Sequence, residues 1–557
     1  MESLTFEIKY SEARHLPIVT AFAKKLGIIE EVDRIIDCQM ELSPGRVVLG
    51  LILDTLSGRT PLFRLHEFFA HHDTELLLGQ NIPAKKFSDD NVGRVLDRIF
   101  EVGTQKILGA ISLNAIKMFD LELQAVHFDT TSRNLYGDYS LYGEDNPLAP
   151  FAITFGFSKD KRPDLKQFVI SLLSVDKGIP IFFQCEDGNA SDKKLNGHIL
   201  NLIAKKMAQL SADDFTYIAD SAAITPANLD LMAEHEVHFI SRLPATYKAC
   251  GQVINEVVQQ DRWEEIGVLA ETAPSQNRKP AAYKVAESHV RLDGRTYRAI
   301  VVHSDAHDQR RLKRLEKAIA ADRHKMAKHL ATLGKQVFFC LPDAQQASRA
   351  KFASDLHQLE LEIVEQPVYA AGRPRKDGSK PIKATRYVLT GTIVPEAAKV
   401  AQFQQEAGCF VLLTNRSSAA LSPAEVLKLY KDQHYIEQNF AFLKDPIIIN
   451  EIFLKKPERI EALGLILVLA LMIWRLIERT MRQTLQEKQD KVPGWDRKPT
   501  AKPTAFMMST KFSSMGILKV GEVRRFNHPI DEIQLKYLEI LGLTIDIFLK
   551  PEAVMMN

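Results

Sequence analysis

Two apolar segments of this chain each end in an aspartate, and this feature most restricts the folds that the sequence can adopt. HFDTTS carries Asp129 and YIADSA carries Asp220, and both acids follow β-branched or aromatic residues typical of buried strands. An acid at the end of a buried strand is costly unless it is paired or binds a cation. Strand ends in α/β sheets are also where ligand sites collect. The simpler interpretation is that each Asp only caps the turn that follows it.

The region around these two acids predicts an α/β layout. Its apolar segments, bounded by turn residues, read as strands. A helical run over 192–210 and a helix that begins at Thr225-Pro226 separate the last of them. The segments predicted as strands are LQAVHFDTTS, FAITFGFS, FVISLLSV, GIPIFFQCEDGN, FTYIADSA and VHFISRL.

The first 118 residues predict an all-α domain. Ser43-Pro44, Thr60-Pro61 and Ser88 are each placed as helix N-caps before an apolar run. Several short capped helices in a row suit a DNA-binding module like the helix-turn-helix. A helical packing domain without DNA contact fits the same pattern.

The rest of the chain divides by composition into three further regions. Residues 246–408, with polar strands and a charged helix over 307–333, predict an inserted domain, and 119–245 and 409–482 flank it. The last region, 483–557, begins with a basic, Pro-containing stretch and is predicted as a tail.

Several features predict a cytosolic protein that makes no membrane contact. The apolar run over 462–474 is shorter than the roughly 20 residues that cross a bilayer, so it predicts a helix, over 457–482, buried on all sides. The N-terminus has no apolar signal region. The five cysteines are far apart, which favours a reducing compartment.

A third acid, Glu437, lies in a segment predicted as one helix over 422–444. At ~100° per residue, Tyr430, Gln433, Glu437 and Lys444 would share one face of that helix. A solvated surface helix is the simpler interpretation. Taken together, however, Asp129, Asp220 and Glu437 suit hard divalent cations such as Mg²⁺, which prefer carboxylate oxygens. Two such ions can promote in-line phosphoryl displacement without a His or Cys nucleophile.

The sequence resembles the DDE transposases of bacterial insertion sequences, and within them the branch with the catalytic-helix motif Tyr-x2-Arg-x3-Glu-x6-Lys. Tyr430, Glu437 and Lys444 stand at the motif's spacings, and Gln433 occupies the Arg position. Further stretches carry the resemblance in the same order along residues 5–510: HFDTTS, GFSKDKRPDLKQF, GIPIFFQCEDGNASD, ADSAAIT, FISRLPAT, GCFVLLTN and FLKKPERIEAL.

The resemblance implies a ribonuclease-H-like α/β catalytic core with a mostly β insertion domain, preceded by the all-α N-terminal domain. Asp129, Asp220 and Glu437 would be the catalytic, metal-binding triad for two Mg²⁺ ions, with Mn²⁺ as a substitute. The chain would bind the inverted-repeat ends of its element as a homodimer, cleave them, and join the 3′-OH ends to target DNA. It would act in the bacterial cytoplasm, at the nucleoid.

Contacts to DNA are expected from local basic clusters, because the chain as a whole is nearly neutral, with 72 Lys and Arg against 70 Asp and Glu. Tyr430, Gln433 and Lys444 are expected near the cleaved phosphate. Residues 371–386 hold six Lys and Arg against one acid, and Arg373, Arg375 and Lys376 form an Arg-Pro-Arg-Lys turn suited to a narrow minor groove. Residues 310–335 hold nine against two. A flexible basic loop and a solvated helix are the simpler interpretations.

Two other classes of protein fit parts of this pattern. One is a sequence-specific DNA-binding protein with a silent nuclease core, and the other is a structure-specific nuclease that never joins strands. Metal-dependent nicking separates the first from a transposase, and strand transfer of precleaved ends separates the second.

Overall fold

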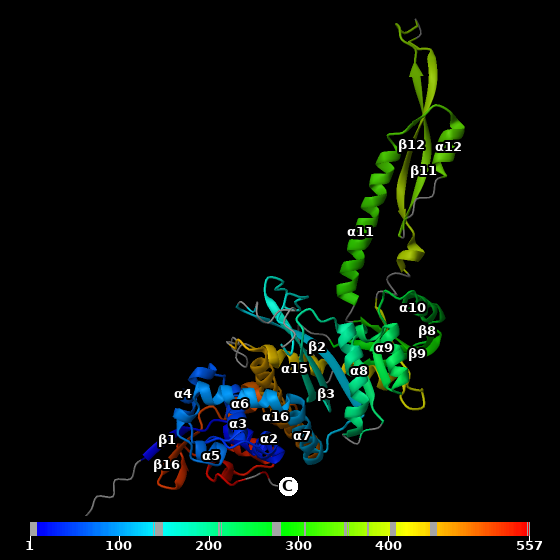
Figure 1. The fold of residues 1–557 in the computed structure, drawn as a ribbon. Coiled ribbons are helices and arrows are strands. Elements are labelled where there is room, and N and C mark those ends of the chain that lie inside the picture. Colours follow the sequence, from blue (N-terminus) through cyan, green and yellow to red (C-terminus); the bar gives the residue numbers. More distant parts are fainter. Residues whose placement is uncertain are drawn as a thin grey trace, which may run out of the picture. The chain divides into compact units, whose positions relative to one another are not determined.

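The computed structural model describes the chain except for residues 1–7, 138, 140–148, 210–211, 213, 270–279, 306–307, 350–353, 355, 376–377, 402–407, 446–453, 554 and 556–557. The chain forms two compact units (Figure 1). The first comprises Met1–Ser241 with Leu429–Asn557, and the second comprises Arg242–Lys428.

The N-terminal part of the first unit is helical, as the sequence predicts. Two predicted caps are confirmed, because Ser43 accepts a hydrogen bond from Arg46 N and Ser88 from Asn91 N, each at 3.4 Å. The helices are α1 (Leu16–Leu26), α2 (Ile28–Ile36), α3 (Pro44–Thr55), α4 (Leu65–Ala70), α5 (Thr74–Leu78), α6 (Asp89–Val102) and α7 (Thr104–Phe119).

The predicted cap at Thr60 is wrong. The Thr60 hydroxyl donates to Asp54 Oδ1 at 2.8 Å, and the Thr60 backbone N–H donates to the same carboxylate at 2.9 Å. Pro61 then leads into a single 3₁₀ turn, Leu62–Arg64, before α4 begins. Asp54 is buried, and a buried carboxylate must be hydrogen-bonded. The Thr60 hydroxyl therefore bonds to Asp54 and does not cap a helix.

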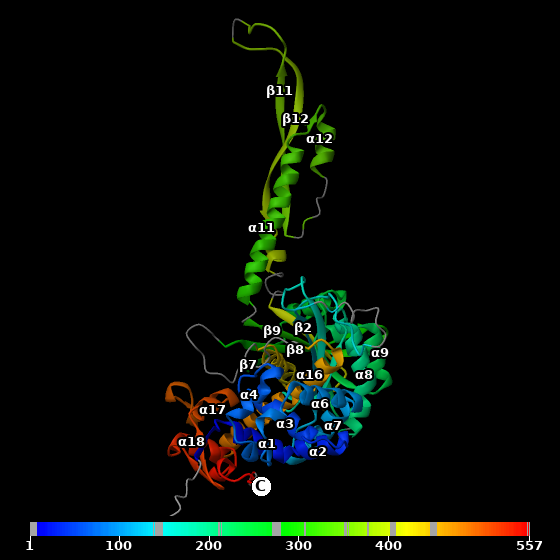
Figure 2. The same ribbon diagram turned by 60° about the vertical axis from the view of Figure 1, so that its left-hand side comes forward.

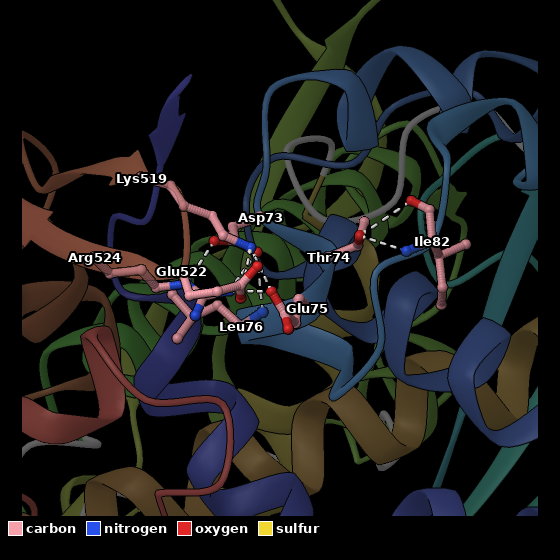
Figure 3. Close-up of polar contacts among 8 residues, drawn as sticks. All are labelled: Asp73, Thr74, Glu75, Leu76, Ile82, Lys519, Glu522 and Arg524. Atoms are coloured by element: carbon pink, nitrogen blue, oxygen red, sulfur yellow. Dashed lines mark hydrogen bonds and ion pairs between the residues drawn. The ribbon is translucent and has the colours of Figure 1, made fainter. Parts of the chain in front are cut away.

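The N-terminal region is not purely helical, which corrects the prediction of an all-α domain. Strand β1 (Ile8–Glu12) pairs antiparallel with β16 (Gly516–Val520), which also pairs with β17 (Val523–Phe526). Figure 3 shows ion pairs between the N-terminal helical region and the β16–β17 hairpin. Arg524 lies 2.7 Å from Asp73 and 2.6 Å from Glu75. The partner of β1 is about 500 residues away along the chain, so no local sequence pattern predicts this pairing.

Five neighbouring strands of a mixed sheet position the two predicted acids (Figure 1). Their order is β4-β3-β2-β5-β6. The pairs β4–β3 and β3–β2 are antiparallel, and the pairs β2–β5 and β5–β6 are parallel. The strands are β2 (Ala125–Leu135), β3 (Lys166–Val175), β4 (Ile179–Glu186), β5 (Thr216–Ala219) and β6 (His238–Arg242), and α8 (Asp192–Gln209) and α9 (Pro226–Glu234) lie between them in the chain.

The predicted helix start at Thr225-Pro226 is confirmed, since Thr225 accepts from Asn228 N at 3.2 Å. FAITFGFS, by contrast, is not a strand: a single bridge joins Thr154 to Gln167. Gly156 explains the difference, because a Cβ there would clash with the Gly188 carbonyl oxygen. The segment is held against the backbone of 188 instead of joining the sheet.

Helix α16 (Pro457–Glu487) is the central core helix of this unit (Figure 2). It packs against α3, α6, α7 and β4, and a Cβ at Gly464 would clash with the Phe183 ring of β4. By length and composition it could cross a membrane, but 89% of its most apolar window is buried inside the protein. The prediction of a helix buried on all sides is confirmed, although the helix ends five residues later than predicted.

The C-terminal region after α16 is not an irregular tail. It contains β14 (Val492–Pro493), β15 (Pro499–Thr500), α17 (Ala505–Lys511), β16, β17 and α18 (Glu532–Ile540). Arg497 and Lys498 of the basic stretch lie between β14 and β15, and Lys502 lies shortly after β15.

The second unit contains two antiparallel sheets. In the first, the strand order is β13-β9-β8-β7, and in the second it is β10-β12-β11. Helices α11 and α12 pack along the long β11–β12 hairpin (Figure 1). The elements are α10 (Lys248–Gln260), β7 (Glu264–Val268), β8 (Ala282–Leu292), β9 (Arg295–Ser304), α11 (Asp308–Leu333), β10 (Val337–Phe338), α12 (Leu341–Ser348), β11 (His357–Tyr369), β12 (Ile382–Pro395) and β13 (Cys409–Thr414).

Candidate functional site

The parallel pairing of β2 with β5 brings Asp129 and Asp220 side by side. His127 pairs with Ile218 in the ladder, and each aspartate follows two residues later on its own strand. Asp220 comes directly after the last residue of β5, whereas β2 continues beyond Asp129 along β3. Because neighbouring strands lie about 4.8 Å apart and side chains alternate with a period of two, both carboxylates leave the same face of the sheet.

The electrostatics of the two aspartates reflect their shared, partly dry surroundings. Burial, together with the smaller effects of the charges of Asp220 and Asp192, raises the pKa of Asp129 to about 7, against the opposing effects of the Lys159 charge and the Thr130 N–H. Burial also raises the pKa of Asp220, and the charge of Asp192 adds to this. The site therefore resists holding several negative charges unless a cation is present.

Asp220 also caps its turn, as the simpler interpretation of the sequence proposes. Its Oδ1 accepts from Ala222 N at 3.0 Å, and its backbone carbonyl accepts from the Ser241 hydroxyl at 2.7 Å. Asp129 similarly accepts from Thr130 N at 2.7 Å. One oxygen of each carboxylate is thus engaged locally, and these bonds fix the orientation of both side chains.

A third carboxylate, Asp192, lies beside this pair and was missed in the sequence. It stands in the first turn of α8, and its Oδ1 accepts from the Thr130 hydroxyl at 2.6 Å. Lys159 donates to the Thr130 carbonyl at 2.6 Å and hydroxyl at 2.9 Å, and its ammonium lies 3.6 Å from Asp192 Oδ2. An acid in the first turn of a helix is common for reasons of helix polarity alone, so the sequence holds no signal that marks this one.

The predicted helix over 422–444 is broken, which corrects the expectation of one polar face. Helix α14 (Pro423–Lys431) ends before Asp432, and α15 (His434–Lys444) begins two residues later. Backbone bonds from Gln433 N to Tyr430 O and from Tyr435 N to Asp432 O close tight turns at the break. Tyr430 therefore lies on a different helix from Glu437 and Lys444.

Helix α15 runs along β2, the strand that carries Asp129. At its start, Gln433 Nε2 donates to the Phe128 carbonyl at 3.1 Å. At its end, the Lys444 carbonyl accepts from Arg133 Nη1 at 3.4 Å, and the Lys444 ammonium pairs with Asp160 at 2.7 Å. Gln433 and Lys444 thus fasten the helix to the sheet region.

Glu437 is exposed in the first turn of α15, and its side chain has no hydrogen bond or ion pair with the residues that the structure describes. Within those residues, no three His, Cys, Asp or Glu side chains are close enough to hold a metal ion. The structure therefore brings together two of the three predicted acids and places the third on the helix beside their strand.

The two basic clusters predicted to contact DNA, over 371–386 and 310–335, lie in the second unit. Arg373 and Arg375 are exposed in the turn between β11 and β12. Arg375 N donates to the Ser379 carbonyl at 2.8 Å, and Gly378 N to the Arg375 carbonyl at 2.9 Å, so the turn is closed by its own backbone. Lys376 lies outside the described residues. The basic cluster over 310–335 falls almost entirely on α11.

Two known domain families match the chain. A domain of unknown function, DUF4277, matches residues 8–113, and the transposase DDE domain matches residues 156–473, which is more than half of the chain. The chain therefore belongs to the transposase DDE domain family. The family match includes Asp192, Asp220 and Glu437, and Asp129 precedes it. No curated protein matches the chain.

Membership of this family confirms the resemblance to DDE transposases and makes transposition the activity of its class. DNA is the partner that such a domain acts on, and transposases of this class generally use divalent metal ions. The helical N-terminal region and the mixed α/β region confirm the broad fold class.

Proposed function

We propose that this protein is an active transposase that cleaves DNA at the ends of its insertion sequence and joins the 3′-OH ends to target DNA. The observation that carries the proposal is the register of β2 and β5, which sets Asp129 and Asp220 beside each other. We further propose that these strands belong to a ribonuclease-H-like core, which the second unit interrupts as an insertion. The mixed strand order around β2, with a parallel partner on one side and an antiparallel partner on the other, supports this assignment.

The donor atoms at the site fit a hard divalent cation such as Mg²⁺ or Mn²⁺. Asp129, Asp220 and Asp192 offer carboxylate oxygens. Burial raises the pKa of Asp129 and of Asp220 despite the charge of Lys159, and a bound cation would offset this cost of ionising them. Asp129 and Asp220 would hold the ions, and Glu437 would complete the set from α15. Two bound ions supply charge stabilisation to the attacking and leaving oxygens of an in-line phosphoryl displacement.

The other residues of the site position these acids and the DNA. Gln433 fixes the start of α15 to the backbone beside Asp129, so Glu437 is carried on a helix that is anchored to the catalytic strand. Lys159 keeps one positive charge beside Asp192 and Thr130. Tyr430, Gln433 and Lys444 would lie near the cleaved phosphate, and Arg373, Arg375 and Lys376 would contact the DNA from the β11–β12 turn.

Assembly and location complete the proposal. The protein would act as a homodimer on paired transposon ends, in the bacterial cytoplasm at the nucleoid. The helical N-terminal region, which includes the DUF4277 match, would bind the inverted repeat.

The test is a cleavage assay on duplex DNA that carries the inverted repeats flanking the coding region. Asp129→Ala, Asp220→Ala and Glu437→Ala are each expected to abolish Mg²⁺-dependent cleavage and to leave DNA binding intact. Glu234→Ala, which changes an exposed acid on α9, is the matched control and is expected to cleave normally.

Cleavage that survives any one of the three substitutions removes that residue from the mechanism. Wild-type protein that binds the ends but never nicks them is a silent DNA-binding protein. Protein that nicks but cannot transfer precleaved ends is a nuclease. Either result overturns the proposal.

A further inference from the structure

A cavity of about 390 Å³ lies next to the aspartate pair, within the first unit. Its lining includes Lys159 and Asp192, which contact Thr130 beside Asp129, and Ala222, whose N–H donates to Asp220. The volume lies in the range of sites that receive small molecules or single substrate groups. A group that enters this cavity therefore comes close to both candidate catalytic carboxylates.

Gln167 gives the cavity an unmet hydrogen-bond acceptor. The side chain lines the cavity but is only 1% exposed, and its Nε2 donates to the Gly188 carbonyl at 2.6 Å and the Phe157 carbonyl at 3.3 Å. Two carbonyl partners fix which end of the amide is the NH₂ group. Its Oε1 is buried and has no hydrogen-bond partner in the described part of the chain. Because leaving such an atom unpaired is costly, the site calls for a ligand that donates N–H or O–H.

Phe157 gives the same cavity an aromatic surface. Its side chain is 90% exposed, so the folded protein does not gain the free energy that burial of a phenyl ring supplies. Its backbone is held, because Gln167 binds its carbonyl and the neighbouring Gly156 packs directly on the backbone at 188. The ring is thus presented to solvent from a fixed position at the cavity, as in sites where aromatic side chains stack on nucleobases.

We propose that this cavity receives one unpaired nucleobase of the DNA strand at the cleavage site. Phe157 stacks on the base, and Gln167 Oε1 accepts a hydrogen bond from its exocyclic amino group. Lys193, an exposed cation of the lining, contacts the phosphate of the same nucleotide. Adenine, cytosine and guanine carry such an amino group and thymine does not, so the cavity prefers these three bases to thymine. This inference rests on the proposed function, because it names the part of the DNA that the site holds.

Binding of short fluorescein-labelled single strands to the full-length protein tests the inference. The probes are oligonucleotides of deoxyadenosine, deoxycytidine or thymidine, and anisotropy is measured in EDTA so that nothing is cleaved. Wild-type protein is expected to bind the adenine and cytosine strands more tightly than the thymine strand. Phe157→Ala is expected to weaken binding of the preferred strands by roughly fivefold to a hundredfold, because one stacked base is lost.

Phe155→Ala is the matched control, since Phe155 lies two residues away, is 55% exposed and is not part of the lining. It is expected to bind as wild type. Phe157 makes no buried packing contact, so its replacement leaves folding intact, which thermal unfolding checks. Gln167→Leu is expected to remove the preference for adenine and cytosine over thymine.

Equal affinity of wild type, Phe157→Ala and Phe155→Ala overturns the proposal, as does a thymine strand that binds as tightly as the others. The latter result would show that Gln167 Oε1 does not accept from an exocyclic amino group. These outcomes are distinct from failure of the proposed function. Asp129→Ala is expected to lose cleavage and keep the base preference, whereas loss of the cavity's role leaves the dependence of cleavage on Asp129 unchanged.

Discussion

Charged residues gather at two places in this protein, and their surroundings are opposite. Asp129 lies on β2 and Asp220 directly follows the parallel neighbour β5, and burial raises the pKa of both. Arg373 and Arg375 lie in the turn of an antiparallel hairpin, where both are exposed. The parallel sheet forces like charges together and strips water from them, whereas the hairpin turn leaves its charges solvated. The first arrangement suits chemistry on a bound phosphate, and the second suits attraction of a polyanion.

The largest expected effect tests whether the negative charge of Asp220 or only its hydrogen-bonding shape matters. Asp220→Asn keeps an oxygen that can accept from Ala222 N, so the turn cap survives while the charge is lost. Cleavage of transposon-end DNA is expected to fall by at least ~10³-fold, with the melting temperature preserved. If Asp220→Asn cleaves at the wild-type rate, Asp220 is only a cap.

The second effect measures the cost of burying Asp129. In metal-free protein, the folded state keeps the Asp129 proton up to about pH 7, whereas the unfolded state releases it near pH 4. The folded state therefore binds more protons in this window, and the free energy of unfolding falls as pH rises from about 4 to about 7. Asp129→Asn removes this loss and is expected to be more stable than wild type above pH 7, by up to about 4 kcal/mol.

Urea unfolding in EDTA across this pH range measures the difference. Glu234→Gln, an exposed acid on α9, is the control and is expected to show no such gain. Added Mg²⁺ is expected to stabilise wild type and not Asp129→Asn, because binding to the folded state alone raises the free energy of unfolding. A pH-independent difference between the two proteins would contradict the raised pKa of Asp129.

The third effect concerns Asp192, the carboxylate that lies beside Asp129 and Asp220. Asp192→Asn keeps a hydrogen-bond acceptor for Thr130 but removes a negative charge next to Asp129. The Mg²⁺ concentration needed for half-maximal cleavage is expected to rise by ~10- to 100-fold, as for residues that support metal ligands. Lys194→Ala changes an exposed neighbour on the same helix and should leave the Mg²⁺ requirement unchanged.

The smallest effect is expected at the hairpin turn. The double substitution Arg373→Ala with Arg375→Ala is expected to weaken binding to duplex DNA about tenfold and to make the salt dependence shallower by about two ions. Neither stability nor cleavage of bound DNA should change, because both side chains are exposed. Lys399→Ala removes an exposed cation that pairs with Glu396 at 2.9 Å and serves as the control. An unchanged salt dependence of binding would show that the β11–β12 turn does not contact DNA.

Local signals in the sequence predicted several elements of the fold. Ser43, Ser88 and Thr225 are N-caps as expected, because a cap depends only on a side chain and a backbone N–H three residues away. The buried helix α16 follows in the same way from a continuous apolar run. Strand β2, which contains Asp129, and strand β5, which Asp220 follows, were also predicted from their own β-branched and aromatic residues.

Specific contacts outside the local hydrophobic and capping patterns decided the elements that were missed. Thr60 does not cap a helix because the carboxylate of Asp54 takes its hydroxyl. FAITFGFS is not a strand because Gly156 packs on the backbone at 188. The break after α14 follows from tight turns at Asp432 and Gln433, where the Gln433 side chain bonds to Phe128 on another element.

The sequence by itself determined which residues carry the charges and which segments can be helix or strand, because those properties belong to single side chains and their near neighbours. Only the tertiary structure decided which charges meet. Asp129 and Asp220 are 91 positions apart, and a ladder between β2 and β5 makes them neighbours. Asp192 meets them through a hydroxyl on β2, and Gln167 Oε1 has no partner among the described residues, because pairing and burial are set by segments that no local pattern connects.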